Sequence, residues 1–406
     1  MLTDPKGAGL SPERLAHIDR FLQENYIDAG LLPGALTVVA RRGVVAHLSP
    51  LGKRDLAQGL PVEQDTIFRI YSMTKPITAV AALMLVEEGL IALDDPVHRF
   101  IPEWRGLGVY QAGLHPQFQV RRPDRPMRVI DLFRHTSGLT YGFQNRTNVD
   151  AAYRALKVGT VTFDGTLESM VADLATLPLE FSPGTNWNYS VSTDVLGFLV
   201  QSISGKPLDV FFRERIFEPL GMDDTAFMVP DDKLARFAAC YEARPDERLA
   251  LYDAPETSPY RTMPSLLAGG GGLVSTATDY LAFCRMLLDG GRANGRQVLS
   301  PKTIELMTAN HLPGGKTLDD LSVSLFAEGA FAGVGFGLGV SVTTDPAAAM
   351  LPGSVGEFSW GGLASTAFWV DPREALIVVF MTQLIPSTLY NIRRQLRTLV
   401  YSAITD

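Results

Sequence analysis

The sequence has 406 residues and a formal net charge of −8, and this length predicts one large two-region domain or two domains rather than a single small core. Its acidic and basic residues are scattered, with no basic face, so we expect no binding of nucleic acid or of an anionic membrane. No apolar run reaches the roughly 18 residues that cross a bilayer, and the N-terminal stretch lacks a signal-peptide pattern, so we expect a cytoplasmic enzyme or binding protein.

The first predicted element is an amphipathic helix in SPERLAHIDRFLQENY, residues 11–26, where apolar residues recur at helical spacing and Ser11 is a natural N-cap. Residues 35–49 then contain two short β-branched runs around Arg42 and Gly43, which predicts a hairpin. Strands are expected again near the other end, followed by a closing helix over 386–404. The expected strands are FGLGVSV (336–342), STAFWVDP (365–372) and ALIVVFMTQ (375–383).

Six helix-like segments lie between these two groups of strands. They are the segments around residues 75–90, 128–135, 167–176, 191–204, 207–216 and 276–289. This order predicts an α+β fold in which one antiparallel sheet is built from both chain ends, with terminal helices beside it. We expect residues 1–75 and 320–406 to form that region, residues 76–319 to form a mainly helical region, and the active site to lie in the cleft between them.

The motif YSMTK places Ser72 and Lys75 three residues apart, directly before the apolar run ITAVAALMLV. On a helix this spacing puts both side chains on one face, with the ammonium within reach of the hydroxyl. Burial behind the apolar run would disfavour the charged form of Lys75 and make it a plausible base for a serine nucleophile. Taken alone, the same pattern also fits a capped helix start.

Two further stretches carry chemistry. In FSPGTNWNYSVSTDVLGFLV, residues 181–200, Tyr189 follows a Pro-Gly turn at the mouth of an apolar helix, where its phenol could relay a proton or simply be a buried hydroxyl. In FSWGGLASTAFWVDP, Gly361 and Gly362 follow Trp360 beside an expected strand. Paired glycines allow the backbone to approach a ligand closely, so that N–H groups can bind an oxyanion, although a bulge is an equal alternative.

In order and separation, YSMTK, NYS and WGG resemble the three motifs of the serine β-lactamase and penicillin-binding superfamily, and the chain is most similar to the β-lactamase-like (family VIII) carboxylesterases. LFRHTSGLTYG, RIFEPLGM and GGGGLVSTATDYLAFCRML add to this resemblance. It implies a β-lactamase-like fold, with Ser72 as nucleophile and with Lys75 and Tyr189 as base and proton relay. It also implies an oxyanion hole formed by the backbone N–H groups of Ser72 and Leu363.

The departures from the penicillin-hydrolysing pattern concern the substrate pocket. The resemblance places Trp360, Gly361, Gly362 and Val191 at this pocket, with the Trp360 indole lining the acyl site. Lactam-hydrolysing relatives usually carry Lys-Thr-Gly where this chain has Trp360 to Gly362, and an asparagine where it has Val191. Both losses favour neutral, apolar acyl groups over anionic lactams.

We therefore expect the substrate to be a small-molecule ester with a short to medium acyl chain. Its cleavage is expected to pass through an acyl-enzyme on Ser72. An acyltransferase using the same acyl-enzyme is the alternative within this chemistry, and a β-lactamase or penicillin-recognising protein is the alternative outside it. We expect no cofactor and no metal site, because the six histidines are dispersed without H-x-x-x-H spacing or cysteine partners. The natural substrate and the oligomeric state stay open.

Four further features have structural interpretations. His135 is expected to satisfy local backbone groups, and Asp194 to cap or orient the segment after Tyr189. Gly269–Gly272 predicts a tight turn before a capped helix rather than a nucleotide site. Cys240 and Cys284 are expected to be reduced, buried small hydrophobic residues.

Overall fold

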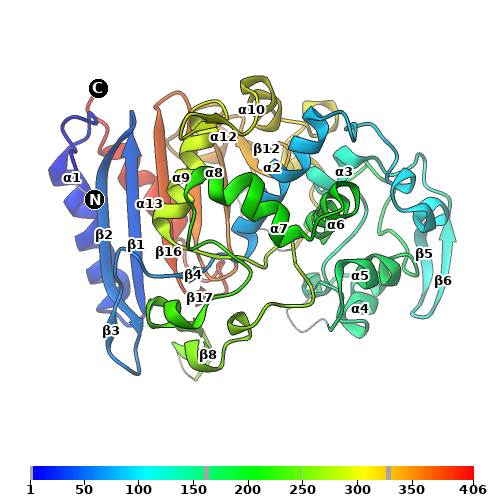
Figure 1. The fold of residues 1–406 in the computed structure, drawn as a ribbon, viewed down its shortest axis with the longest axis horizontal. Helices are drawn as coiled ribbons and strands as arrows, with labels where there is room; N and C mark the ends of the chain where they lie inside the picture. Colours follow the sequence, from blue (N-terminus) through cyan, green and yellow to red (C-terminus); the bar gives the residue numbers. More distant parts are fainter. Residues whose placement is uncertain (1–2, 160–163, 247, 326–330) are drawn as a thin grey trace.

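The computed structural model describes residues 3–159, 164–246, 248–325 and 331–406. Figure 1 shows a sheet with the terminal helices α1 (Pro12–Leu22) and α13 (Ile392–Ser402) on one side and the helical region on the other. Both chain termini lie at the sheet end of the molecule. The predicted α+β arrangement, with one antiparallel sheet built from both chain ends and terminal helices beside it, is confirmed.

The central sheet is assembled from both ends of the chain. In the described residues its eight strands pair in the order β12-β13-β14-β15-β16-β1-β2-β3, and every neighbouring pair is antiparallel. The strands are β1 (Gly34–Arg41), β2 (Val44–Asp55), β3 (Leu60–Pro61), β12 (Val334–Phe336), β13 (Ser341–Thr343), β14 (Phe358–Gly361), β15 (Ala367–Asp371) and β16 (Leu376–Thr382). The β1–β16 pair, with Val38 opposite Val379, joins the two ends.

The outer face of the sheet is covered by α1 and α13. The Ser11 hydroxyl caps α1 by accepting the Arg14 N–H at 3.3 Å, as the sequence predicts. Leu15, Ile18 and Leu22 then point inward at helical spacing and belong to a core formed with α13 and the outer face of the sheet. This core fixes the chain ends against the sheet.

The inner face is covered by helices of the larger core. α2 (Thr74–Glu87) is apolar nearly all round, so it is buried on almost every side, and it packs against α6 (Ser192–Ser204). α9 (Ala277–Leu288) packs on β16. The other three expected helical segments contain α3 (Val129–Phe133), α5 (Leu167–Leu174) and α7 (Leu208–Phe212).

One local expectation was wrong, and one element was not expected. The run FGLGVSV is not one strand, because its middle turns back with Gly339 at φ +92° and joins β12 to β13. The region expected to be mainly helical also contains a two-stranded hairpin, β5 (Val109–Leu114) and β6 (Gln117–Arg121). Most of its residues are exposed, so the apolar alternation that reveals a half-buried strand is absent.

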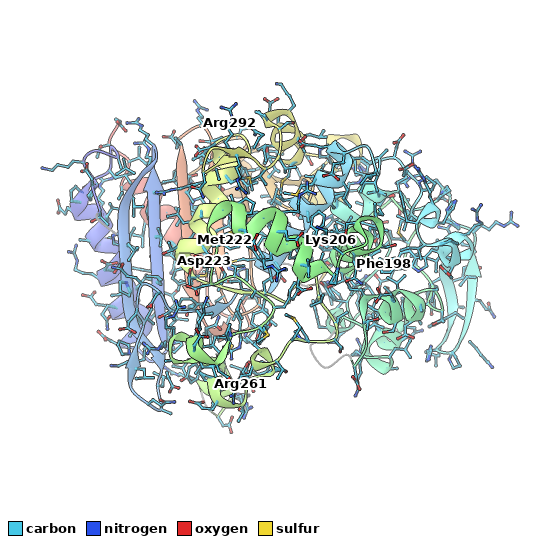
Figure 2. All side chains as sticks on the ribbon, viewed as in Figure 1. Phe198, Lys206, Met222, Asp223, Arg261 and Arg292 are labelled. Carbon is cyan, nitrogen blue, oxygen red and sulfur yellow. The ribbon has the colours of Figure 1, made fainter. Side chains whose placement is uncertain are left out.

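Charged side chains are spread over the surface. Figure 2 shows the labelled Lys206, Asp223 and Arg261 apart from one another on the same face. Lys206 pairs with Glu214, and Arg261 pairs with an acidic residue at 3.2 Å. Such exposed pairs contribute little to stability.

Cys240 and Cys284 are buried, and neither forms a disulfide. No single helix within the described ranges is both long and apolar enough to cross a membrane. One pair, α6 together with Leu208–Leu220, meets the length and composition test only jointly, and it is bent by 84°.

Candidate active site

Ser72 lies in a short 3₁₀ turn, Tyr71–Met73, immediately before α2. Tyr71 has φ +42°, a left-handed conformation that costs free energy for a residue with a side chain. Its ring is buried against Cys240 and Ala364, which holds this conformation in place. The turn leaves Ser72 partly exposed at the wall of a cleft.

Lys75 and Tyr189 converge on the Ser72 hydroxyl. The Tyr189 hydroxyl donates a hydrogen bond to Ser72 Oγ at 2.6 Å, and Lys75 Nζ donates to the same oxygen at 3.2 Å. Lys75 Nζ also donates to the carbonyl of Gly270 at 2.6 Å and lies 4.6 Å from the centre of the Tyr189 ring. Each of the two side chains is only 1% exposed. A serine hydroxyl next to two groups that can exchange protons has the geometry of an activated nucleophile.

Asp194 and Gly270 complete the surroundings of Lys75. The Asp194 carboxylate accepts the N–H of Gly270 at 2.8 Å and the hydroxyl of Tyr141 at 3.5 Å. Burial raises the pKa of Asp194, whereas the Lys75 charge and the Gly270 N–H act in the opposite direction. Asp194 lies in the first turn of α6, yet its carboxylate reaches the Gly269–Gly272 turn, a role that the sequence did not indicate.

Ser72 and Leu363, the two residues expected to form the oxyanion hole, lie at the same cleft. Leu363 lies in the turn between β14 and β15, and both residues line the cleft. In the described part of the chain, neither N–H donates a hydrogen bond to the protein. A Cβ on Gly362 would lie 2.4 Å from the carbonyl oxygen of Ile70, so only glycine lets this turn approach the segment that carries Ser72. Two unengaged donors beside a serine can bind an oxyanion.

Trp360 lies behind Tyr189 and not in the wall of the cleft. It is 2% exposed, and its ring packs against Tyr189 and Phe336 with centroid distances of 5.5 and 5.3 Å. The cleft around Ser72 does not include it among its lining residues. In this structure the indole packs behind the tyrosine, and its expected place at the acyl site stays a prediction.

Gly361, Gly362 and Val191 also lie outside the lining of the cleft. A Cβ on Gly361 would lie 2.6 Å from Cζ of Arg393, so this glycine accommodates an arginine of α13. Val191 is fully buried at the N-cap of α6, and its N–H donates to the carbonyl of Thr140 at 3.2 Å. These residues lie behind the cleft in this structure, and their expected contact with a substrate stays a prediction.

The cleft at Ser72 has a volume of about 750 Å³ and a mainly apolar wall. The aromatic and large apolar residues of this wall include Tyr141, Phe143, Phe227, Tyr252, Tyr260, Met263 and Leu266. Among its lining residues the charged ones are Arg154 and Asp194, and Arg154 pairs with Asp150 at 2.8 Å. Gly270, Gly271 and Gly272 form part of the wall, so the glycine run contributes to the site as well as forming a turn.

His135 packs edge-on against Tyr189, with ring centroids 5.1 Å apart. Its Nδ1 lies 3.2 Å from Ser190 Oγ, so it bonds a side chain and not the backbone group that was expected. Burial, and to a smaller extent the Lys75 charge, holds the pKa of His135 well below its usual value. The ring is therefore a neutral packing element next to the site.

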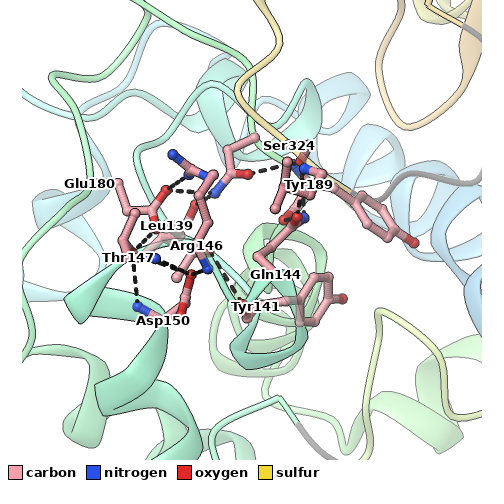
Figure 3. A network of polar contacts seen from close by, with 12 residues as sticks. Leu139, Tyr141, Gln144, Arg146, Thr147, Asp150, Glu180, Tyr189 and Ser324 are labelled. Atoms are coloured by element: carbon pink, nitrogen blue, oxygen red, sulfur yellow. Dashed lines mark hydrogen bonds and ion pairs between the residues drawn. The ribbon is translucent and has the colours of Figure 1, made fainter.

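The backbone of Tyr189 is held by a polar network that the sequence did not reveal. Figure 3 shows the side chains of Gln144 and Ser324 meeting at this segment. The Tyr189 N–H donates to Ser324 Oγ at 2.8 Å, and Gln144 Nε2 donates to the Tyr189 carbonyl at 3.2 Å. Asn188 Oδ1 accepts from Ser324 Oγ at 2.8 Å. Side chains from three separate stretches thus fix the tyrosine before any ligand binds.

Comparisons with known proteins cover almost the whole chain. The family model Beta-lactamase matches residues 18–401. Protein Rv1367c of Mycobacterium tuberculosis is 41% identical over 88% of each chain, and Esterase EstB of Burkholderia gladioli is 32% identical over 86% of each. The solved structure of EstCE1, a hydrolase with promiscuous acyltransferase activity, has a TM-score of 0.78 and 26% identity, and the match covers 96% of this chain and 99% of that one.

Proposed function

The chain belongs to the beta-lactamase family, and we propose that within this family it is a carboxylesterase that forms an acyl-enzyme on Ser72. The relatives named esterase and hydrolase support ester chemistry. The observation that carries the proposal is the convergence of Tyr189 and Lys75 on Ser72 Oγ, at 2.6 and 3.2 Å, beside two N–H groups for which the described residues offer no acceptor.

The reaction follows from this geometry in two halves. Ser72 Oγ attacks the ester carbonyl, and its proton passes to the network of Lys75 and Tyr189. The N–H groups of Ser72 and Leu363 stabilise the negative charge on the carbonyl oxygen. The same network returns the proton to the leaving alcohol, and it then takes a proton from the water that attacks the acyl-enzyme. The acid leaves, and Ser72 regains its proton.

The walls of the cleft favour uncharged esters over anionic lactams. Its lining is largely aromatic and aliphatic, and its cation Arg154 already pairs with Asp150. A ligand carboxylate placed there would lose hydration without gaining a dedicated partner. We accordingly propose esters of short to medium acyl chains as substrates.

Acyl transfer is the second candidate. EstCE1, whose solved structure is similar to this one, is a hydrolase with promiscuous acyltransferase activity. An alcohol that enters the cleft in place of water would take the acyl group from Ser72 by the same proton transfers. Adding a primary alcohol to the assay separates the two outcomes, because transfer yields a new ester whereas hydrolysis yields the acid.

The test of the proposed function is to measure hydrolysis of p-nitrophenyl esters of graded acyl chain length. Hydrolysis of nitrocefin and of penicillin is measured in parallel for comparison. We expect kcat/KM for the short esters to exceed that for the lactams by about a hundredfold, which corresponds to roughly 2.7 kcal/mol of barrier. Penicillin turnover as fast as butyrate ester turnover would overturn the assignment in favour of a lactamase. Failure to hydrolyse any ester of the series would overturn it as well.

A further inference from the structure

Asp194 is a buried carboxylate at the edge of the site that the proposed reaction does not use. It is 3% exposed and lies in the first turn of α6, five residues after Tyr189. A carboxylate in the first turn usually binds the N–H groups at the start of its own helix. Here its oxygens accept from the N–H of Gly270 and the hydroxyl of Tyr141, both outside the helix, as well as from the N–H of Asp194 itself. A capping role alone therefore does not explain its position.

Gly270 is held on both sides, by Asp194 and by Lys75. Its N–H donates to Asp194 Oδ1 at 2.8 Å, while its carbonyl accepts from Lys75 Nζ at 2.6 Å. A Cβ on Gly270 would lie 2.6 Å from Asp194 Oδ2 and 2.9 Å from the Tyr141 hydroxyl, so the carboxylate packs directly on this backbone. The position of Gly270 decides where the ammonium of Lys75 is anchored.

We propose that Asp194 is a positioning residue for the base: it fixes Gly270 so that the glycine carbonyl aims Lys75 at Ser72, and its negative charge favours the protonated form of the lysine. The inference rests on the proposed acyl-enzyme at Ser72. Asp194 would be a fourth side chain of the site, beside Ser72, Lys75 and Tyr189, and it would act through the backbone of Gly270.

The groups that face this carboxylate and the lysine come from several elements. Lys75 projects from α2, and Tyr141 precedes the 3₁₀ turn Gly142–Gln144. The Lys75 ammonium lies 4.6 Å from the centre of the Tyr189 ring, and its charge lowers the pKa of His135 in addition to the larger effect of burial. Burial holds the pKa of His135 well below its usual value and raises that of Tyr141, so neither ring carries a charge at neutral pH, and the opposite-charge interaction of Asp194 within this group is with Lys75.

Two substitutions of Asp194 separate its hydrogen bond to Gly270 from the effect of its negative charge on Lys75. Asp194→Asn keeps an oxygen that can accept the Gly270 N–H but removes the charge, whereas Asp194→Ala removes both. Asp279→Asn is the matched control, because Asp279 is also buried and accepts a backbone N–H, that of Asp224, at 2.8 Å in α9. Each protein is assayed for ester hydrolysis from about pH 5 to about pH 10, for its thermal midpoint, and for the rate at which a fluorophosphonate labels Ser72.

For Asp194→Asn we expect the ascending limb of the kcat/KM profile, and of the labelling rate, to move to lower pH by about one unit, with plateau kcat retained within a few fold. For Asp194→Ala we expect kcat to fall roughly tenfold to a hundredfold with KM changed by less than about twofold, because the base is misaligned. Asp279→Asn should leave the limb and kcat at their wild-type values.

The outcomes distinguish this inference from the proposed function. If wild-type protein labels at Ser72 but both Asp194 variants have the limb and kcat of Asp279→Asn, the positioning role is wrong and the esterase stands. If Asp194→Ala fails to fold, Asp194→Asn still decides, since an unmoved limb contradicts the proposal. If wild-type protein neither labels at Ser72 nor hydrolyses esters, the proposed function and this inference fall together.

Discussion

The indole of Trp360 packs against the ring of Tyr189, with centroids 5.5 Å apart, and Phe336 lies at 5.3 Å from the indole. Trp360 lies near the end of β14, so the sheet supports the ring whose hydroxyl bonds Ser72. Trp360 therefore contacts Ser72 only indirectly, through the ring of Tyr189. In the proposed reaction, this packing would align the tyrosine that relays the proton.

Trp360→Ala should therefore reduce kcat for every acyl chain length, and it should destabilise the fold by roughly 3 to 5 kcal/mol through the cavity left behind. Trp360→Phe should restore most of both losses, because it keeps an aromatic contact with Tyr189. Steady-state kinetics across the ester series and urea unfolding measure the two effects. A change in KM confined to the longer acyl chains would instead indicate that the indole contacts the substrate.

Lys75→Ala and Tyr189→Phe should each lower turnover strongly, and their effects should not add. Both side chains bond the same oxygen of Ser72, so loss of either disrupts one proton-transfer network. We expect the double variant to be only slightly worse than the more damaging single variant. A loss equal to the sum of the two single losses, expressed as free energies of activation, would show that the groups act independently.

Arg393 should matter for turnover although it lies on the outer face of the sheet. Its Nη2 donates to the carbonyl of Gly362 at 2.7 Å and to that of Thr366 at 2.8 Å, and these bonds hold the turn that carries the Leu363 N–H. We expect Arg393→Gln to lower kcat by roughly tenfold to a hundredfold with little change in KM, because one oxyanion donor loses its fixed place.

The matched control is Arg394→Gln. Arg394 is the next residue of α13, but it donates to the carbonyls of Ala349 and Met350, away from the turn. Its substitution should leave kcat unchanged. Equal losses in the two variants would point to a general effect on α13 and not to the oxyanion hole.

His135 should make the fold sensitive to mild acid. Its pKa is held well below the usual value by burial and then by the Lys75 charge, so between that lowered pKa and about 6.5 the unfolded chain binds a proton that the folded chain does not. The free energy of unfolding therefore falls as pH drops through this window, with a slope of up to about 1.4 kcal/mol per pH unit.

His135→Gln removes this titration. Urea unfolding at several pH values between about 7.5 and about 5 should show the wild-type protein losing stability relative to the variant as pH falls below about 6.5. Parallel stability curves for the two proteins would mean that His135 becomes protonated in the folded state as readily as in the unfolded one.

Much of the fold could be predicted because its signals are local. The Arg42-Gly43 turn between β-branched runs indicated β1 and β2, and the apolar spacing with Ser11 as cap indicated α1. The β5–β6 hairpin was missed because its side chains are mostly exposed, so no burial pattern marks it. The β12–β13 turn was missed because Gly339 lies in a run that is otherwise apolar and β-like.

The candidate site likewise contains residues that the sequence could indicate and contacts that it could not. Ser72 and Lys75 are three residues apart, and Tyr189 lies in a short motif, so residue types and spacing could indicate them. The carbonyl of Gly270 has no side-chain signature, and it reaches Lys75 only through a contact 195 residues apart in the chain. The direction in which Trp360 points depends on packing against Phe336 and Tyr189, which a motif of three residues does not encode.

The most direct test of the account is mass spectrometry of protein quenched during turnover of p-nitrophenyl butyrate. We expect one butyryl group on the peptide that contains Ser72, and none in Ser72→Ala, whose hydrolysis rate should be lower by about a thousandfold or more. A fluorophosphonate adduct should form on the same residue and should likewise be absent from Ser72→Ala. A butyryl group on a different residue, or activity of Ser72→Ala within about tenfold of wild type, would contradict the assignment of Ser72 as the nucleophile.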